Sequence, residues 1–419
     1  MSINLFDYQL KCINFMKNNN GLILYHSMGS GKTITSLICA AQFEYPIIVI
    51  CTKSSKKNFH DDIKKIKEHD ISNININLEN LEPKNIKIMT YKKMIGLIIN
   101  KNISLKDFTI IVDEAHHLRS QTKLASILIN ELMNARKLLL LTGTIFYNSL
   151  IDISPLINLV KKKSVLPLTI KEFEFYYYDN NYNTPTNTDL FVDLIQYTIS
   201  CHKIDSNNNP AYPTSKTEYY SIDMSNKQIS EYRHYLRKIL SLDDIQHIDF
   251  NVMDKRKVNN FLTVTRQLSN TVDKCPNSPK IIAIYDYIKK NSNEQTIVYS
   301  NFIDNGVLPL SVHLQKNNIS FQVFHGGQSE TNRESIIDNY NSGLFKVLLI
   351  TSVGSESLDL KNTRFIHIME PHWNESKTNQ IIGRSVRFNS HASLPIKDRN
   401  VTIIHWYSKF GHKKTYNFV

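Results

Sequence analysis

A short stretch near the N-terminus combines the residue types that bind phosphate. An apolar run, residues 22–25, leads into His26-Ser27-Met28-Gly29-Ser30-Gly31-Lys32-Thr33, and a mostly apolar run, residues 34–41, follows. Glycines let backbone N–H groups converge on a phosphate, and a helix N-terminus adds a favourable dipole. The order predicts a strand, a nucleotide-binding loop and a helix. Lys32 is expected to reach the β and γ phosphates of a triphosphate, and Thr33 to hold Mg²⁺.

Two adjacent carboxylates, Asp113 and Glu114, directly follow an apolar run, residues 108–112, that predicts a buried strand. One carboxylate can hold Mg²⁺ opposite Thr33, and the other can orient and deprotonate an attacking water. We assign Asp113 to the metal and Glu114 to the water. An Asp-Glu pair after a strand is by itself more often a solvated turn, so the catalytic interpretation depends on the loop upstream.

Positive charge for such a site is available near the other end of the chain. The segment QIIGRSVR, residues 380–387, places Arg384 and Arg387 three positions apart, which predicts one shared face of a helix. They are either solvated arginines or the groups that stabilise the charge of a phosphoryl-transfer transition state. Gln9, on a predicted helix before the loop, is either a surface amide or a group that hydrogen-bonds to the edge of adenine.

The elements around these residues alternate between apolar strands and helices. Strands are predicted at 22–25, 46–51, 86–89, 108–112 and 137–141, and again at 295–299, 321–324, 346–350, 365–369 and 401–406. Helices are predicted between most of them, beginning with residues 5–16. This alternation predicts an α/β fold with doubly wound parallel sheets, in which ligands gather at the carboxyl ends of the strands.

The same patterns divide the chain into three parts. Residues 1–222 are predicted to form a first lobe that ends with a strand at 216–222. It carries a partly helical insertion at about 161–210, which includes an amphipathic helix at 190–201. Residues 223–277 are predicted to form a helical linker, and residues 278–419 a second lobe.

Composition narrows the class of protein. The 419 residues are 41% hydrophobic and 21% charged, and no apolar run approaches the ~20 residues of a membrane span. The N-terminus shows no secretory signal, and five scattered cysteines predict free buried thiols without a zinc site. The net charge of +12 fits either a lysine-rich surface or attraction to a phosphate backbone, and charge alone leaves both open.

Taken in order, six motifs resemble those of the superfamily 2 helicases and translocases. They are Gln9, MGSGKT at 28–33, DEAH at 113–116, TGT at 142–144, Gly354 within ITSVGSESLDL, and QIIGRSVR. A finer resemblance is to the Swi/Snf-type branch with the poxvirus nucleoside triphosphatase I, the small subunit of the poxvirus early transcription factor and giant-virus relatives. It rests on LLLLTGTIFYNSLIDISPLINLV and EPHWNESKTNQIIGRSVRFNSH. Loops of this class often lack the first glycine, so His26 fits.

The resemblance implies two RecA-like lobes that bind ATP between them, and it implies further roles for residues at strand ends. Phosphates of a nucleic-acid strand are expected at Thr52, Lys53, Thr90 and Thr351, and at Asn301, His325 and Gly326. The residues expected to couple the nucleotide to the nucleic acid are His116, Thr142, Gly143, Thr144 and Gln380, with Gly354 and Glu356 touching both. For Thr90, Asn301 and His325 a purely structural turn role is the alternative.

The predicted function is ATP hydrolysis with Mg²⁺ coupled to movement along nucleic acid, with duplex DNA expected and translocation favoured over strand separation. An RNA helicase shares the same motor. A further alternative is a non-motor scaffold that binds DNA under ATP control within a viral transcription complex. The resemblance implies viral RNA polymerase or transcription factors as partners. The implied location is the cytoplasmic factory of an infected host cell, or the virion, and not a membrane or the secreted fraction.

Overall fold

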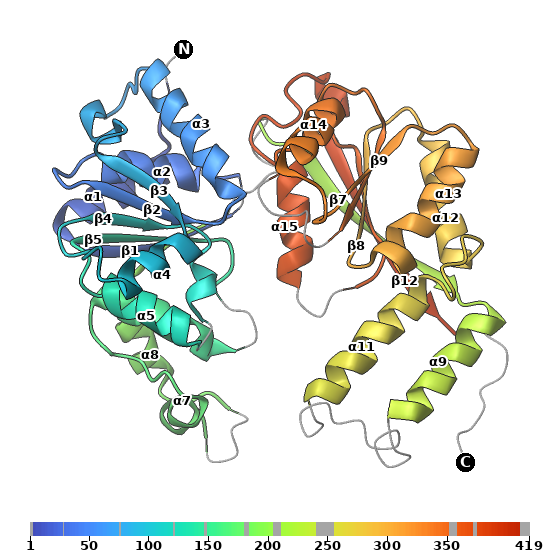
Figure 1. The fold of residues 1–419 in the computed structure, drawn as a ribbon, viewed down its shortest axis with the longest axis horizontal. Helices are drawn as coiled ribbons and strands as arrows, with labels where there is room; N and C mark the ends of the chain where they lie inside the picture. Colours follow the sequence, from blue (N-terminus) through green and yellow to red (C-terminus); the bar gives the residue numbers. More distant parts are fainter. Residues whose placement is uncertain are drawn as a thin grey trace. The chain divides into compact units, whose positions relative to one another are not determined.

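The computed structural model describes residues 3–27, 29–74, 77–119, 122–145, 149–179, 184–203, 211–239, 255–351, 358–371 and 375–410. The chain divides into two compact units, residues 1–204 and 205–419. Each unit is built on a six-stranded sheet whose neighbouring strands all run parallel (Figure 1). Helices pack on these sheets, so the predicted α/β class with two parallel-sheet lobes is confirmed.

The first sheet has the strand order β3-β2-β4-β5-β1-β6. Its strands are β1 (Gly21–His26), β2 (Ile47–Cys51), β3 (Ile86–Thr90), β4 (Thr109–Val112), β5 (Lys137–Thr142) and β6 (Ile199–His202). The register pairs Leu24 with Leu141 and Leu140 with Val112, so β1, β5 and β4 end within a few residues of one another along the sheet. The loops that follow these strands therefore emerge from one edge of the sheet.

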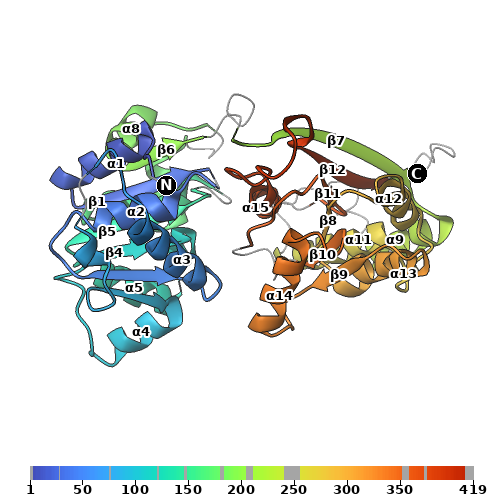
Figure 2. The same ribbon diagram turned by 90° about the horizontal axis from the view of Figure 1, so that it is seen from above.

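Helices cover both faces of this sheet (Figures 1 and 2). One face packs on α1 (Asp7–Asn18), α2 (Lys32–Ala40) and α3 (Ser55–Glu68); the other packs on α4 (Tyr91–Ile99), α5 (Lys123–Leu132) and α6 (Ser154–Lys161). Successive residues of β1 alternate between the two cores, since Leu22 and Leu24 join the first and Ile23 the second. Burial on both faces explains why this strand is apolar without interruption.

The second sheet has the order β7-β12-β11-β8-β10-β9. Its strands are β7 (Thr214–Asp223), β8 (Thr296–Ser300), β9 (Phe321–Phe324), β10 (Val347–Thr351), β11 (Phe365–Ile368) and β12 (Asn400–Lys409). One core holds α12 (Pro279–Lys290) and α13 (Leu308–Lys316), and the opposite core holds α14 (Glu330–Asn341) and α15 (Glu375–Ser385). Two more helices, α9 (Asn226–Ile239) and α11 (Lys255–Asn270), pack on each other.

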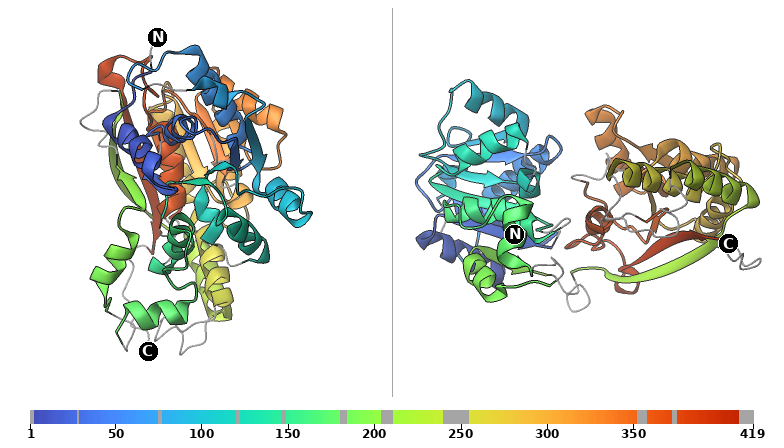
Figure 3. Two further views of the ribbon diagram at one scale, coloured as in Figure 1. Left: turned by 90° about the vertical axis from the view of Figure 1, so that its left-hand side faces the viewer. Right: turned by 90° about the horizontal axis from the view of Figure 1, so that it is seen from below.

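The predicted boundary of the first lobe at residue 222 is wrong. Strand β7 pairs with β12 along its whole length, from Thr214 opposite Asn400 to Asp223 opposite Lys409, and the two lie side by side in Figure 3 (yellow-green and red). The units divide after Ile204 instead. Local pattern identifies a strand, but the partner of β7 lies far along the chain, and only tertiary packing selects it.

The predicted insertion is only partly an insertion. It contains α7 (Ile170–Tyr177) and α8 (Thr188–Ile195), and then β6, which completes the first sheet beside β1. The helix predicted at 190–201 is therefore wrong beyond Ile195. Tyr197 has the left-handed φ of 59°, a conformation that a continuing helix does not accept.

Candidate active site

The loop after β1 bends at its glycines. Gly29 and Gly31 have φ angles of 76° and 78°, and Gly31 directly precedes α2. A side chain on Gly31 would also bring its Cβ within 2.9 Å of Gln9 Nε2. Glycine is thus required there both for the backbone conformation and for the close approach of α1. Met28 lies outside the described residues.

The ammonium group of Lys32 lies inside this loop. Its Nζ donates to the carbonyl oxygens of His26, at 2.7 Å, and Ser27, at 3.1 Å. Lys32 and the half-buried Thr33 are the first two residues of α2, where backbone N–H groups and the helix dipole favour an anion. A phosphate bound here would compete with the two carbonyls for the ammonium.

His26 is a packed support for the loop. Its side chain is fully buried, and its Nε2 lies 2.8 Å from Ser200 Oγ on β6. Burial, with a smaller effect from the Lys32 charge, lowers the pKa of His26 to about 4, so the ring is neutral at physiological pH. Tyr8 stacks on His202 with 3.6 Å between ring centroids and donates to Ser30 O at 2.6 Å. His26 is therefore part of the framework that holds the loop.

The sequence patterns assigned no role to Tyr8, Ser200 or His202. The last two lie on β6, the strand that the patterns missed, and only the sheet brings them beside the loop.

Gln9 braces the loop from α1. Its side chain is 4% exposed; its Oε1 accepts from Phe6 N at 2.9 Å and its Nε2 donates to Thr35 Oγ1 at 2.8 Å. A carboxamide has two acceptor positions and two donors, so these contacts use half of its capacity. Recognition of adenine by the other half stays a prediction.

The two carboxylates leave the sheet at the end of β4. Asp113 continues the strand, with its N–H donating to Ile50 O at 2.8 Å, whereas Glu114 has a left-handed φ of 50°. Glu114 Oε2 lies 3.1 Å from His116 Nδ1. Because only β5 separates β4 from β1, the carboxylates and the loop are about two strand spacings, or ~10 Å, apart at the same edge.

Tyr91, the first residue of α4, holds the Asp113-Glu114 peptide from just beyond the end of β3. Its hydroxyl donates to Asp113 O at 2.6 Å, with a longer contact of 3.3 Å to Glu114 O. A left-handed non-glycine residue costs of the order of 1 kcal/mol and persists only where its surroundings hold it. Tyr91 supplies part of that hold. The sequence patterns missed it, because its partners follow about 20 positions later in the chain.

The other predicted residues of the first unit also lie at strand ends. Thr142, at the end of β5, accepts from Thr144 N at 3.1 Å and donates to Thr144 O at 2.8 Å, which closes the turn through Gly143. Thr52 follows β2 and its hydroxyl lies 3.0 Å from those of Ser54 and Ser55, while Lys53 is exposed. Thr90 ends β3, and its hydroxyl accepts from Lys93 N at 3.3 Å. Nucleic-acid contacts at these residues stay predictions.

The predicted arginines of the second unit do not share a helix. Arg384 lies in α15 and is 7% exposed, but α15 ends at Ser385 and Arg387 follows it. Arg387 Nε donates to Gly383 O at 3.0 Å, and its Nη1 lies 3.4 Å from Asp359 Oδ1. The shared helix face is therefore a wrong prediction: Arg387 turns back on the last turn of the helix instead of extending it.

The remaining predicted residues of the second unit that the structure describes lie on a strand end, a loop and a helix. Thr351 is only 3% exposed at the end of β10. His325 Nδ1 accepts from Gly327 N at 3.2 Å beside an exposed Gly326, and Gln380 is half-buried on α15. Gly354 and Glu356 lie outside the described residues.

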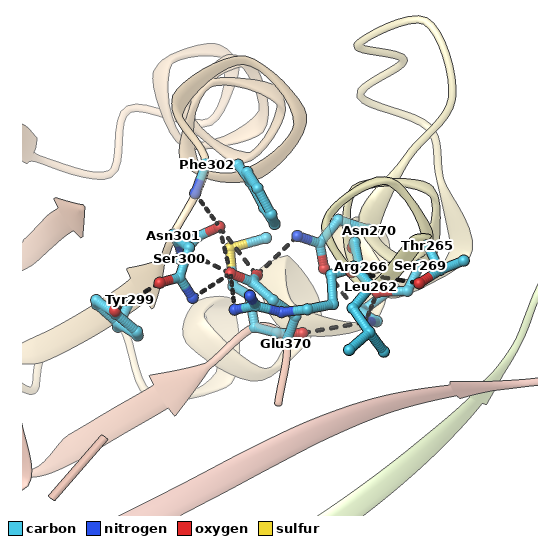
Figure 4. A network of polar contacts seen from close by, with 12 residues as sticks. Leu262, Thr265, Arg266, Ser269, Asn270, Tyr299, Ser300, Asn301, Phe302 and Glu370 are labelled. Carbon is cyan, nitrogen blue, oxygen red and sulfur yellow. Dashed lines mark hydrogen bonds and ion pairs between the residues drawn. The ribbon is translucent and has the colours of Figure 1, made fainter. Parts of the chain in front are cut away.

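Asn301 belongs to a buried polar network centred on Glu370 (Figure 4). Glu370 is fully buried and accepts from Asn301 N at 2.6 Å, Asn301 Nδ2 at 3.1 Å and Asn270 Nδ2 at 2.7 Å. Ser300 Oγ donates to the same carboxylate at 2.9 Å. The Oδ1 of Asn301 accepts from Tyr299 at 3.0 Å, so most of this amide is already engaged. These contacts favour the structural alternative for Asn301.

Two cations border the same network. Arg266, on α11, lies 3.9 Å from Glu370 Oε1. Lys280, on α12, donates to Asn270 Oδ1 at 3.2 Å and to Met369 O at 3.0 Å. Burial lowers the pKa of Lys280 to about 7, and the Glu370 charge opposes that shift. The network therefore ties α11 and α12 to the ends of β8 and β11.

The described residues contain no group of three or more His, Cys, Asp or Glu side chains placed to hold a metal ion. Mg²⁺ at a nucleotide needs only one or two protein oxygens, and the Thr33 hydroxyl and Asp113 carboxylate are suitable donors. All five cysteines are free; Cys12, Cys39 and Cys51 are buried as predicted, whereas Cys201 and Cys275 are exposed. Within the described part of the chain, every helix is too short or too polar to cross a membrane.

Comparisons with known proteins agree with this arrangement. Residues 8–276 match the family model of the SNF2-related domain, and residues 279–389 match the helicase conserved C-terminal domain. A protein of Acanthamoeba polyphaga mimivirus, named as an ATP-dependent RNA helicase, is 42% identical over 98% of this chain and 91% of its own length. A protein of African swine fever virus, named as a homologue of the termination factor NPH-I, is 26% identical over 92% of this chain and 69% of its own.

A solved structure shows a similar fold. The helicase domain of Pyrococcus furiosus Hef aligns over 96% of this chain and 95% of its own, with a TM-score of 0.55 and 15% identity. The resemblance stated from the motifs is confirmed by the family models and the relatives. The chain therefore belongs to the SNF2-related family of superfamily 2 helicases and translocases, the nucleic-acid-dependent ATPases.

Proposed function

We propose that this protein hydrolyses ATP with Mg²⁺ and uses the reaction to move along duplex DNA. The observation that carries the proposal is the arrangement at the edge of the first sheet. There a left-handed glycine loop encloses the Lys32 ammonium, and a strained, hydrogen-bonded Glu114 lies two strands away. The loop and Lys32 bind the phosphates. Glu114 orients and deprotonates the attacking water.

Thr33 and Asp113 are the proposed ligands of Mg²⁺, which offsets the charge of the phosphates when it is bound. Arg384 and Arg387 are proposed to add positive charge as the γ phosphate leaves. Arg387 forms an ion pair with Asp359, an exposed partner that a phosphate can replace. Gln9 is proposed to recognise adenine. Thr52, Lys53 and Thr90 are proposed to hold phosphates of one strand, which gives contact without sequence specificity.

The test is the ATPase rate of the purified chain with duplex DNA, single-stranded DNA, duplex RNA or no polynucleotide. We expect duplex DNA to raise kcat most. Glu114→Gln should lower the stimulated kcat by 10² to 10⁴ fold, the usual contribution of a general base, while nucleotide binding is retained. Glu82→Gln is the matched control, since the Glu82 carboxylate pairs with Lys67 at the surface. Turnover that no polynucleotide stimulates would refute the motor.

An RNA substrate is the second candidate, because the 42% identical relative carries an RNA-helicase name. The same comparison separates the two, since an RNA motor is stimulated more by RNA than by duplex DNA. Displacement of a third strand from a triplex, beside displacement of one strand from a duplex, separates translocation from unwinding. Tight ATP binding without turnover on any polynucleotide would favour the non-motor scaffold.

We infer the setting from the relatives. Their viral origin favours a role in transcription or genome handling in the cytoplasm of an infected cell, and the termination-factor name favours transcription. The proposed partners are therefore viral RNA polymerase and its factors. Co-purification of the polymerase with tagged protein from infected cells tests this, and its absence would favour genome handling.

A further inference from the structure

Thr90 and Tyr91 are adjacent residues whose hydroxyl groups contact different segments: that of Thr90 contacts the start of α4, and that of Tyr91 contacts the Asp113-Glu114 segment. Thr90 is the last residue of β3, and Tyr91 is the first residue of α4. The Thr90 hydroxyl caps α4 by accepting from Lys93 N at 3.3 Å. Thr90 is also the proposed phosphate contact, whereas the hydroxyl of Tyr91 reaches the carboxylate segment.

The contact of Tyr91 spans the edge of the sheet. In the order β3-β2-β4, the strand that precedes Tyr91 and the strand that precedes Asp113 are not neighbours. The ladder links them only through β2, where Thr90 pairs with Cys51 and Asp113 N donates to Ile50 O. The phenol adds a direct link of 2.6 Å to Asp113 O, past the intervening strand.

The chemistry of Tyr91 keeps this link in place. A phenol hydroxyl is a hydrogen-bond donor at neutral pH, and here it donates to the Asp113 carbonyl oxygen at 2.6 Å. The ring packs against the core under α4 and meets His117 edge-on, with centroids 5.7 Å apart. Because the packed ring belongs to the first residue of α4, a displacement of that end of the helix also displaces the hydroxyl from the two carbonyl oxygens that it contacts.

Those carbonyls belong to the peptide units that set the direction of Glu114. The φ of 50° at Glu114 is sparsely populated for a residue with a side chain, so small changes in its support alter its population. Its carboxylate also lies 3.1 Å from His116 Nδ1, an alternative partner to water. The carboxylate that the proposed function assigns to the attacking water is therefore engaged with His116 in this structure.

We propose that Tyr91 is a positioning residue that couples occupancy of Thr90 by nucleic acid to the orientation of Glu114. This inference rests on the proposed function and names how it is regulated. A phosphate that accepts the O–H of Thr90 holds the same hydroxyl that caps α4 by accepting from Lys93 N. The resulting shift at the start of α4 passes through the Tyr91 hydroxyl to the Asp113-Glu114 peptide.

The test compares Tyr91→Phe with wild type in kcat and KM for ATP, with and without a saturating polynucleotide. We expect the ratio of stimulated to basal kcat to fall by about tenfold, equal to ~1.4 kcal/mol, while the KM for ATP stays within about twofold and the Tm within a few degrees. Tyr340→Phe is the matched control. It removes a buried hydroxyl that lies 2.9 Å from Thr363 Oγ1 in the second unit, and should leave stimulation unchanged.

A double-mutant cycle with Thr90→Val provides the second measurement. If the two side chains act in one route, the double variant should lose no more stimulation than the more damaging of the two single variants. Additive losses would overturn the proposal. Full stimulation of Tyr91→Phe would overturn it, and so would equal losses of basal and stimulated rates with a raised KM. Failure of wild type to respond to any polynucleotide would instead refute the proposed function itself.

Discussion

Replacing Glu370 with glutamine is expected to destabilise the second unit by about 3 to 5 kcal/mol. An amide keeps one acceptor oxygen, but its NH₂ group takes the place of the second carboxylate oxygen. The groups that donated to that oxygen then face another donor. Ser300 can rotate its hydroxyl to accept, whereas Asn270 Nδ2, now at 2.7 Å from the carboxylate, cannot. A buried donor without a partner costs about 1 to 3 kcal/mol.

The remaining cost comes from charge. Without the carboxylate, Arg266 and Lys280 lose the negative partner of the network, and breaking a buried pair typically costs about 3 to 5 kcal/mol. Lys280 reduces that cost by releasing its proton, since its pKa of about 7 is already low. The two costs sum to about 4 to 8 kcal/mol, and release of the Lys280 proton lowers this to the range of about 3 to 5 kcal/mol. Against total stabilities of about 5 to 15 kcal/mol this is a large fraction.

The assay is urea unfolding followed by tryptophan emission. The chain has two tryptophans, Trp373 and Trp406, and both belong to the second unit. Trp406 is 2% exposed, so unfolding of this unit shifts its emission to longer wavelength. Glu218→Gln serves as control, because its pairing with Lys216 on β7 is a surface contact worth about 1 kcal/mol or less. A loss below about 1 kcal/mol in Glu370→Gln would refute the central role of the carboxylate.

Two further predictions concern the first unit. The pKa of His26 is lowered to about 4 in the folded protein, so the unfolded chain binds a proton at this residue more tightly than the folded one. The free energy of unfolding is therefore highest above pH 6.5 and decreases as the pH falls toward 4, by about 3 kcal/mol in full. Thermal unfolding of His26→Gln should depend less on pH in this range than that of wild type, and equal dependence would contradict the assignment. Lys137→Met should cost about 1 to 3 kcal/mol, because the buried Lys137 Nζ donates to Met16 O at 2.9 Å and Asn19 O at 2.7 Å at the end of α1. Hydrogen exchange of the α1 amides measures this cost, with Lys17→Met as the control because Lys17 is exposed. Unchanged protection of α1 in Lys137→Met would contradict the proposed role of Lys137 at the end of the helix.

Much of the fold could be predicted because buried parallel strands are apolar on both faces. The runs at 22–25, 46–51 and 137–141 coincide with β1, β2 and β5 to within a residue. Strand β6 could not be found in this way: Ile199 to His202 is a short, half-polar edge strand. The assignment of β7 to its sheet was also out of reach, since pairing depends on packing between distant segments.

The residues of the candidate site also divide into those that the sequence predicts and those that it does not. Lys32, Asp113 and Glu114 are predictable because their chemistry restricts the residue type and the position after a strand. Tyr91, Tyr8 and His202 are not, because their contacts arise from the order of strands in the sheet. The predicted shared helix face of Arg384 and Arg387 is wrong for a local reason, since α15 ends at Ser385, before Arg387.

The pairing of β7 with β12 has a consequence for how the protein is made. The first sheet is complete once His202 has left the ribosome, whereas β7 is synthesised roughly 190 residues before its partner β12. At about 5 to 20 residues per second, β7 waits some 10 to 40 s with its tyrosines and its backbone donors unpaired. The first unit can therefore fold during translation, while the second sheet can close only after β12 has emerged.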